Sequence, residues 1–277
     1  MQFSKILIAP CLIAIGILAF IIFRNDWVWL SWYVAIPAVM IALIFVFAPQ
    51  IDWWFWQYFP PKPDKKIQAL YQRYVPIYNE LNSDERKFID TRVSLFLHSK
   101  IFQWAGGGDT PHDLNAIIAW HAVYMTRKHK DFLLEPYDRY VFYKKLFPSP
   151  EHPYPHASEV NHEDNVFVFS VDMLSAAFKE PSIYFNPAWY EISAAWMKKY
   201  AKWNWPIVSD DIRPQLEQIS GFAEADIMKL YGYKELDLMP LVMHHYFAFE
   251  GAFRTHLPEL AGELDKVVMN EVSNSRF

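Results

Sequence analysis

The sequence predicts an N-terminal two-helix transmembrane hairpin followed by a mainly helical α+β soluble domain with a small sheet. Two uncharged apolar runs, each close to the length of a membrane span, stand at the start of the chain. After them, helix-start signals recur, and two segments are rich in β-forming residues. Hydrophobic residues make up 53% of the 277 residues and aromatic residues 18%. A chain with so much apolar surface to bury is not disordered.

Charge and cysteine content bear on the possible partners and on the cellular compartment. The chain has 26 Lys and Arg residues against 31 Asp and Glu residues, which gives a net charge of −5. It therefore lacks the basic excess typical of nucleic-acid-binding proteins. Cys11 is the single cysteine, so no internal disulfide is possible, and this agrees with a reducing compartment.

The two apolar runs cover residues 6–23 and 27–48. A membrane-spanning helix needs about 20 apolar residues, and both runs are close to that length. Residues 24–26 form so short a connection that the two helices must be antiparallel. A signal peptide would have a shorter apolar region and a small-residue cleavage site, which this segment lacks. A lipoprotein cysteine is disfavoured because Pro10 precedes Cys11 and the apolar run continues past it.

Positive residues flank both ends of the hairpin and predict its orientation. They are Lys5 before the first run, and Lys62, Lys65, Lys66 and Arg73 after the second. The turn carries one Arg beside one Asp. Because positive residues favour the cytoplasmic side, both ends of the hairpin should face the cytoplasm. We therefore expect a cytoplasmic (inner) membrane location, with the hairpin in contact with the lipid bilayer and the soluble domain in the cytoplasm.

Two aromatic clusters stand at the ends of the second run. The first contains Trp27, Trp29, Trp32 and Tyr33, and the second contains Trp53, Trp54, Trp56 and Tyr58. Such rings prefer the membrane interface, so an interfacial belt is favoured over a protein-docking surface for the second cluster. Prolines at 60, 61 and 63 then form a stiff linker. The predicted parts are a hairpin (1–50), an interfacial aromatic segment with a Pro-rich linker (51–69) and a soluble domain (70–277).

Helix-start signals mark the first helices of the soluble domain. Asn82 is followed three residues later by Glu85, a capping-box arrangement, and an apolar stripe at helical spacing comes after them. Thr110 and Pro111 open a second helix. Glycines 106–108 lie between the two helices and lack the Gly-Lys-Ser/Thr ending of a phosphate loop, so they are interpreted as a helix stop.

Two segments read as strands, and helices follow them. Residues 140–146 and 166–170 are rich in β-forming residues. Asn186 and Pro187 then open a helix that runs to about residue 203. The last helices are expected at about 240–255 and 258–270.

The stretch between the two strands, residues 148–165, is rich in proline and contains three histidines, His152, His156 and His162. His152 and His156 would have a metal-binding spacing on a helix, but Pro153 and Pro155 prevent one. We therefore expect no metal in this loop and keep its histidines as weak candidates.

Several blocks follow one another in the soluble domain. They begin with residues 81–102, which include Phe96-Leu97-His98-Ser99-Lys100, and the glycines that follow. Next come Ile117-Ile118-Ala119, Val168-Phe169-Ser170-Val171-Asp172, a helix at Asn186, and Tyr231 ahead of a helix with Tyr246-Phe247. In this order, over about residues 70–270, the blocks resemble the Mlc titration factor A (MtfA) family of zinc metallopeptidases. The resemblance implies a metallopeptidase-like fold, and the membrane hairpin lies outside it.

The resemblance also implies where a zinc site would lie. The family carries His-Glu-x-x-His on one helix, in which two histidines hold zinc and the glutamate activates its water, and a later glutamate is the third ligand. The matching residues here are Tyr190, Glu191 and Ala194, so the base position is kept and both histidines are lost. His245 aligns with the third ligand, and Tyr231 with a tyrosine that assists the transition state.

Each surviving residue also has a structural interpretation. Glu191 in the first turn of its helix would be favoured by the helix dipole or kept as a relic. His244 and His245 are neighbours that face different sides of a helix, so they cannot chelate one ion together. Tyr231 is interpreted as a packing or hydrogen-bonding residue. Catalytic residues are therefore not expected, and Glu191 and Tyr231 are relic candidates.

The favoured hypothesis is a membrane-anchored, catalytically inactive metallopeptidase-like protein. It would act as a binding module or an accessory subunit of a membrane protein complex, with no cofactor and no nucleic acid. The alternative is an active membrane-bound zinc metallopeptidase with altered ligands: Glu191, His245 and a donor from His152, His156, His162 or His256. A hydrolase of another type is disfavoured because the chain has no Gly-x-Ser-x-Gly motif.

Overall fold

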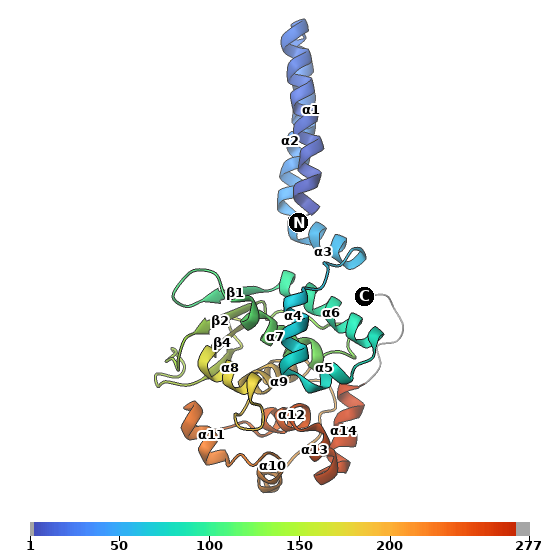
Figure 1. Ribbon diagram of the computed structural model, residues 1–277. Coiled ribbons are helices and arrows are strands. Elements are labelled where there is room, and N and C mark those ends of the chain that lie inside the picture. Colours follow the sequence, from blue (N-terminus) through green and yellow to red (C-terminus); the bar gives the residue numbers. More distant parts are fainter. Residues whose placement is uncertain (1–2, 270–277) are drawn as a thin grey trace. The chain divides into compact units, whose positions relative to one another are not determined.

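A computed structural model describes residues 3–269 (Figure 1). The chain divides into two compact units, residues 1–61 and residues 62–277. Two N-terminal apolar helices belong to the first unit, and a mostly helical domain with a small mixed sheet forms the second. The predicted order of hairpin and α+β domain is confirmed at this level.

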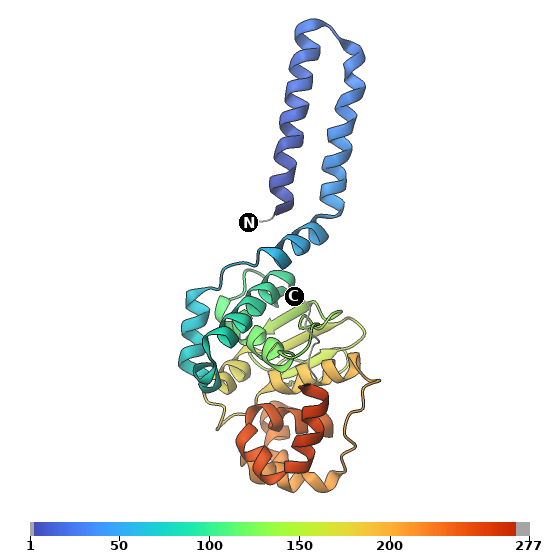
Figure 2. The ribbon, with the colours of Figure 1, turned by 90° about the vertical axis from the view of Figure 1, so that its right-hand side faces the viewer.

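The first unit is a helical hairpin followed by a short helix, as Figures 1 and 2 show. Its elements are α1 (Phe3–Asn25), the 3-10 helix η1 (Val28–Leu30), α2 (Ser31–Val46) and α3 (Ala48–Tyr58). Both α1 and the η1–α2 segment are long and apolar enough to cross a membrane, with mean hydropathies of 3.0 and 2.1. Their apolar side chains are largely exposed within the unit, with Phe23 at 89% and Trp32 at 82%. Apolar exposure of this extent suits a lipid environment rather than water.

A buried contact joins the two ends of this unit. The backbone N–H and the hydroxyl of Ser4, in the first turn of α1, donate hydrogen bonds to the two carboxylate oxygens of Asp52 in α3, at 2.7 and 2.9 Å. The first N–H groups of a helix have no partner within it, so Asp52 serves as a cap for α1 from a distant point in the sequence.

The aromatic segment predicted after residue 50 is largely helical, because α3 covers residues 48–58.

The second unit begins with helices that precede the sheet. They are α4 (Lys65–Tyr74), α5 (Pro76–Glu80) and α6 (Ser83–Ser99). The predicted capping box of Asn82 and Glu85 is present at the start of α6. Asp64 caps α4, which therefore starts five residues before the expected boundary at residue 70.

The described residues contain one four-stranded mixed sheet in the order β1-β2-β4-β3. Its strands are β1 (Ile101–Trp104), β2 (Arg139–Tyr143), β3 (Ser158–Asn161) and β4 (Val166–Ser170). β1, β2 and β4 pair in parallel, while β3 pairs antiparallel with β4, so that Ser158 lies opposite Phe169 and Asn161 opposite Val166. Stacked rings of Tyr140 and Phe167 lie in the core of this sheet.

The remaining helices alternate with the strands or follow them. They are α7 (His112–Met125), α8 (Val171–Lys179), α9 (Pro187–Lys199), the 3-10 helix η2 (Asp210–Ile212), α10 (Arg213–Ser220), α11 (Glu224–Tyr231), α12 (Leu238–Ala248), α13 (Glu250–His256) and α14 (Pro258–Val268). α9 contacts both β3 and α12. The helices from α10 onward gather in one group, coloured orange to red in Figures 1 and 2.

Several predicted boundaries were wrong. Glycines 106–108 follow strand β1 and not a helix, because residues 101–104 pair with β2. α7 begins one residue after Pro111, β2 ends at Tyr143, and α9 ends at Lys199 instead of about residue 203.

The C-terminal helices and one strand also differ from the prediction. The helix expected at 240–255 is two helices interrupted at Phe249, and the expected end at residue 270 lies outside the described residues. β3 lies inside the segment expected to be a loop.

Candidate functional site

A polar pocket of about 430 Å³ lies between β3, the loop before it, α9 and the segment after α11. It collects six of the residues singled out in the sequence: His152, His156, His162, Tyr190, Glu191 and Ala194. Its other lining residues are Glu151, Tyr154, Ser158, Glu159, Val160, Tyr233, Lys234, Glu235 and Asp237. Residues that the sequence separates by more than 80 positions thus face one cavity.

Glu191 is a buried carboxylic acid of this pocket. It is 4% exposed and lies beyond the first turn of α9, so the prediction that it stands in the first turn was wrong. The Ser158 hydroxyl of β3 donates a hydrogen bond to Glu191 Oε1 at 2.7 Å, and the Tyr233 hydroxyl lies 2.6 Å from the same serine oxygen. Burial raises the pKa of Glu191 to about 7, against a smaller lowering by the Ser158 hydrogen bond.

Tyr190 and Ala194 lie on α9 and also face the pocket. The backbone N–H of Asp237 donates to the Tyr190 hydroxyl at 2.8 Å. Burial raises the pKa of Tyr190 above its ordinary value, so the phenol stays neutral. A neutral phenol is a weak metal ligand and alanine offers no ligand atom. The α9 face that would carry two zinc-binding histidines in the resembled family therefore carries a hydrogen-bonded tyrosine and a methyl group.

His245 lies elsewhere in the fold. On α12, its Nδ1 pairs with the Leu241 carbonyl at 2.7 Å and its Nε2 with the Ser220 hydroxyl at 3.0 Å. It lines a separate cavity of about 130 Å³ beside α10. Burial lowers the pKa of His245 to about 4, so the ring is neutral. In the described structure, His245 is not among the residues that line the pocket of Glu191.

His244 and Tyr231 form hydrogen bonds in the core of the domain. His244 Nε2 accepts a hydrogen bond from the backbone N–H of Asn186 at 3.0 Å, on a side of α12 different from that of His245. The Tyr231 hydroxyl donates to the Phe185 carbonyl at 2.6 Å, and the side chain is 1% exposed. The prediction that Tyr231 packs and forms a hydrogen bond is confirmed. His256 lies by another cavity, beside Leu257 and Ile207.

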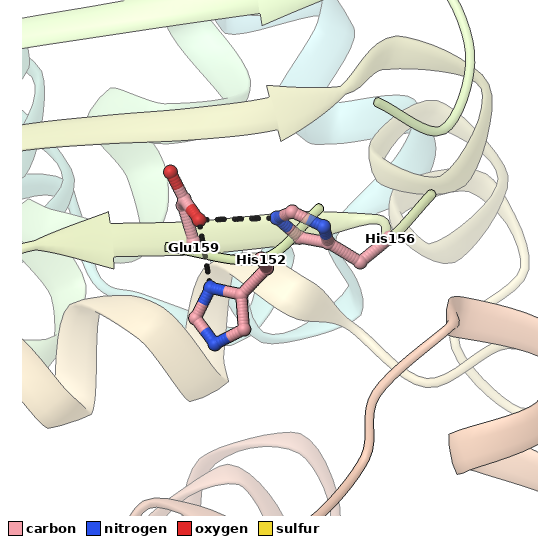
Figure 3. Close-up of side chains that lie close together, drawn as sticks. All are labelled: His152, His156 and Glu159. Carbon is pink, nitrogen blue, oxygen red and sulfur yellow. Dashed lines mark hydrogen bonds and ion pairs between the residues drawn. The ribbon is translucent and has the colours of Figure 1, made fainter. Parts of the chain in front are cut away.

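Two of the loop histidines converge on a carboxylate that the sequence analysis did not single out. Figure 3 shows His152 and His156 on one carboxylate oxygen of Glu159. Both the His152 Nδ1 and the His156 Nε2 lie 3.1 Å from Glu159 Oε2. The prolines do prevent a helix here, but the antiparallel bridge between Phe147 and His156 folds the loop back on itself, so the two rings meet without one. His162 is separate, since its Nδ1 pairs with the Tyr137 hydroxyl at 2.8 Å.

The electrostatics of this cluster are coupled. Burial alone would lower the pKa of His156, but hydrogen bonds to Glu159 and to the Tyr154 carbonyl outweigh it and raise the pKa. Burial would raise the pKa of Glu159, yet hydrogen bonds from His156, Ser149 and His152 lower it. Glu159 is therefore ionised at neutral pH, and the pocket presents one charged carboxylate between two imidazoles.

Comparison with known protein families and curated proteins identified no relative of this chain. No protein-family model matches the chain, and no curated protein matches it. The arrangement of the pocket residues therefore carries the functional argument.

Proposed function

We propose that this protein is a membrane-anchored, catalytically inactive metallopeptidase-like protein that binds a segment of a partner protein in the pocket beside α9. This proposal rests on the chemistry of the three α9 residues that face the pocket. Tyr190 is buried and hydrogen-bonded, Ala194 offers no ligand atom, and Glu191 accepts a hydrogen bond from Ser158. A zinc ion at this face would lack the ligands that the resembled peptidases use.

The position of β3 supports an extended peptide as the bound segment. β3 is the last strand in the order β1-β2-β4-β3, and three of its residues, Ser158, Glu159 and Val160, line the pocket. An edge strand accepts an extended chain by backbone hydrogen bonding, and neighbouring pockets select its side chains. The mixed charges of the pocket favour a polar segment over an apolar one.

The hairpin supports a role at the membrane. Two helices with the length and hydropathy of membrane spans precede the domain, and positive residues flank them at Lys5, Lys62, Lys65 and Lys66. On the positive-inside rule, we place the soluble domain on the cytoplasmic side of the inner membrane. A domain tethered in this way meets membrane proteins at a high effective concentration, which favours an accessory subunit of a membrane complex.

A second candidate, a hydrolase with altered metal ligands, is favoured by one observation. Glu191 has a pKa of about 7, and a general base works best when its pKa lies near the working pH. The same pocket contains two histidines and a second carboxylate. The cluster of His152, His156 and Glu159 could then take the place of the lost ligands.

Capture of the partner tests the binding function. The full chain, purified in mild detergent from its own cells after crosslinking, should bring down a membrane protein. Ala194→Arg, which fills the pocket, should abolish the capture, whereas Ala201→Arg on the exposed surface should not. Equal capture by both variants would contradict a binding role for this pocket.

A further inference from the structure

We propose that His152, His156 and Glu159 form a zinc site of their own, separate from the α9 face. One ligand atom from each residue lies within 4.8 Å of the other two. The set of two imidazoles and one carboxylate is a common catalytic zinc set, whereas carboxylates alone would favour magnesium or calcium. This inference does not rest on the binding function proposed above.

The hydrogen bonds of His156 direct its Nε2 at the Glu159 carboxylate. Its Nδ1 lies 2.9 Å from the Tyr154 carbonyl, which can only accept, so this nitrogen carries a hydrogen. In a neutral ring the Nε2 is then a bare lone pair, yet it faces Glu159 Oε2 at 3.1 Å. Two lone pairs at this distance repel, so the contact requires either a second proton on the ring or a metal ion.

The surroundings orient the three ligands. The Tyr154 carbonyl fixes the His156 ring so that Nε2 points to the cluster, as hydrogen-bond acceptors behind zinc-binding histidines do. The Ser149 hydroxyl donates to Glu159 Oε2 at 2.6 Å, and the backbone N–H of His152 donates to that hydroxyl at 3.1 Å. The loop and the carboxylate are thus held together by bonds outside the three ligand contacts.

Two of the three ligand-to-ligand distances fit a tetrahedral ion. Ligands about 2.05 Å from zinc at tetrahedral angles lie about 3.3 Å from one another. The two nitrogen-to-oxygen distances are 3.1 Å each. The two nitrogens lie within 4.8 Å of each other, and the His152 side chain is 43% exposed, so its ring has room to turn toward a shared ion.

The site would join the Pro-rich loop to the edge strand. His152 and His156 come from the loop and Glu159 from β3, so zinc would cross-link the wall of the pocket to the sheet. Three protein ligands leave the fourth position open, and all three residues line the pocket. Water or a carboxylate of a bound molecule would occupy that position.

Zinc titration of the chelator-treated full chain in detergent tests the site. We expect one equivalent of zinc per chain, and a tetrahedral or five-coordinate absorption spectrum with cobalt. His152→Ala and Glu159→Gln should each weaken zinc binding by at least about 100-fold, because even the loss of a group that only hydrogen-bonds to a ligand costs about 10–100-fold. His152 is partly exposed, so its variant keeps the fold.

His162→Ala is the matched control, because His162 lines the same pocket but pairs with Tyr137 instead of Glu159. It should bind zinc as the wild type does. Absence of stoichiometric zinc in the wild type would overturn the proposal and assign the contact to a doubly protonated His156. Stoichiometric zinc that survives His152→Ala and Glu159→Gln would overturn it as well. Either result leaves the capture experiment unaffected.

Discussion

Ser158 on β3 and Glu191 on α9 meet across the pocket in a buried hydrogen bond of 2.7 Å. The serine hydroxyl has one hydrogen, and since this hydrogen points to Glu191, the Tyr233 hydroxyl donates to the serine oxygen in turn. The carboxyl group is thus satisfied by a chain of side-chain hydroxyls. Glu191, which the resemblance aligns with a general base, is here part of a protein hydrogen-bond network.

The raised pKa of Glu191 should make stability fall as pH rises. In the unfolded chain its pKa is near the ordinary 4.5, and in the fold it is about 7, so the folded state holds an extra proton between these values. The stabilisation is complete below pH 4.5 and is lost as pH rises through 7, by an amount on the order of 3 kcal/mol.

Denaturant unfolding of the chelator-treated full chain at pH 5 and pH 8 measures this effect. Glu191→Gln should remove this part of the pH dependence and be the more stable protein at pH 8. Glu163→Gln replaces an exposed carboxylate and should keep the wild-type pH dependence. Parallel pH profiles for wild type and Glu191→Gln would show that Glu191 is not buried as described.

Buried neutral histidines should make the domain sensitive to acid. Burial lowers the pKa of both His121 and His245 to about 4. The unfolded chain takes up these protons near pH 6.5, so stability is complete above that pH and is lost as pH falls toward 4, by about 3 kcal/mol per histidine.

His245→Gln should reduce the loss of stability in acid by the contribution of one histidine, because glutamine does not titrate. Unfolding measured between pH 7 and pH 4.5 gives the slope. His112→Gln, at an exposed position at the start of α7, is the control. A slope unchanged by His245→Gln would contradict the neutral buried ring.

Much of the fold was predicted because its signals are local. The capping box of Asn82 and Glu85 involves residues three positions apart, and strand β4 is an apolar run from Val166 to Ser170. β1 and β3 escaped prediction because each has four residues and takes its strand form from pairing with a neighbour. The sequence Ser-Glu-Val-Asn of β3 carries no strong β signal of its own.

The site was predicted less completely for the same reason. Its α9 residues were found through the resemblance, but the hydrogen-bond partner of Glu191 is Ser158, which lies 33 positions away. Glu159 was missed because its role depends on the edge strand and on the fold of the loop that carries His152 and His156. A glutamate three residues after a histidine was the available signal, and in a Pro-rich segment it has no fixed meaning.

The cap between Ser4 and Asp52 should stabilise the hairpin. Asp52→Ala removes both hydrogen bonds to Ser4 and leaves the first N–H groups of α1 without this partner. The expected cost is about 1 kcal/mol, as for other helix caps. Thermal unfolding of the full chain in detergent, followed by helix content, measures the loss. Gln50→Ala on the same helix is the control, since Gln50 is exposed. A loss equal to that of Gln50→Ala would contradict the capping role.

The orientation of the hairpin can be tested by labelling single cysteines in intact cells. In a Cys11→Ala background, Asn25→Cys should react with an impermeant reagent, because the positive-inside rule predicts that the turn is on the non-cytoplasmic side. A cysteine at Ser182, an exposed residue of the soluble domain, should react after the cells are opened and not before. The reverse pattern would place the soluble domain outside the cytoplasm.

We propose that the pocket beside α9 binds a peptide without cleaving it, and peptide turnover by the zinc-loaded full chain tests this proposal. Wild type and Glu191→Gln are incubated with a mixed peptide library, and new termini are counted by mass spectrometry. We expect no zinc-dependent cleavage by the wild type above the level of Glu191→Gln. Zinc-dependent cleavage that falls by roughly 10²–10⁴-fold in Glu191→Gln, as expected on removal of a general base, would contradict it and establish an altered-ligand hydrolase.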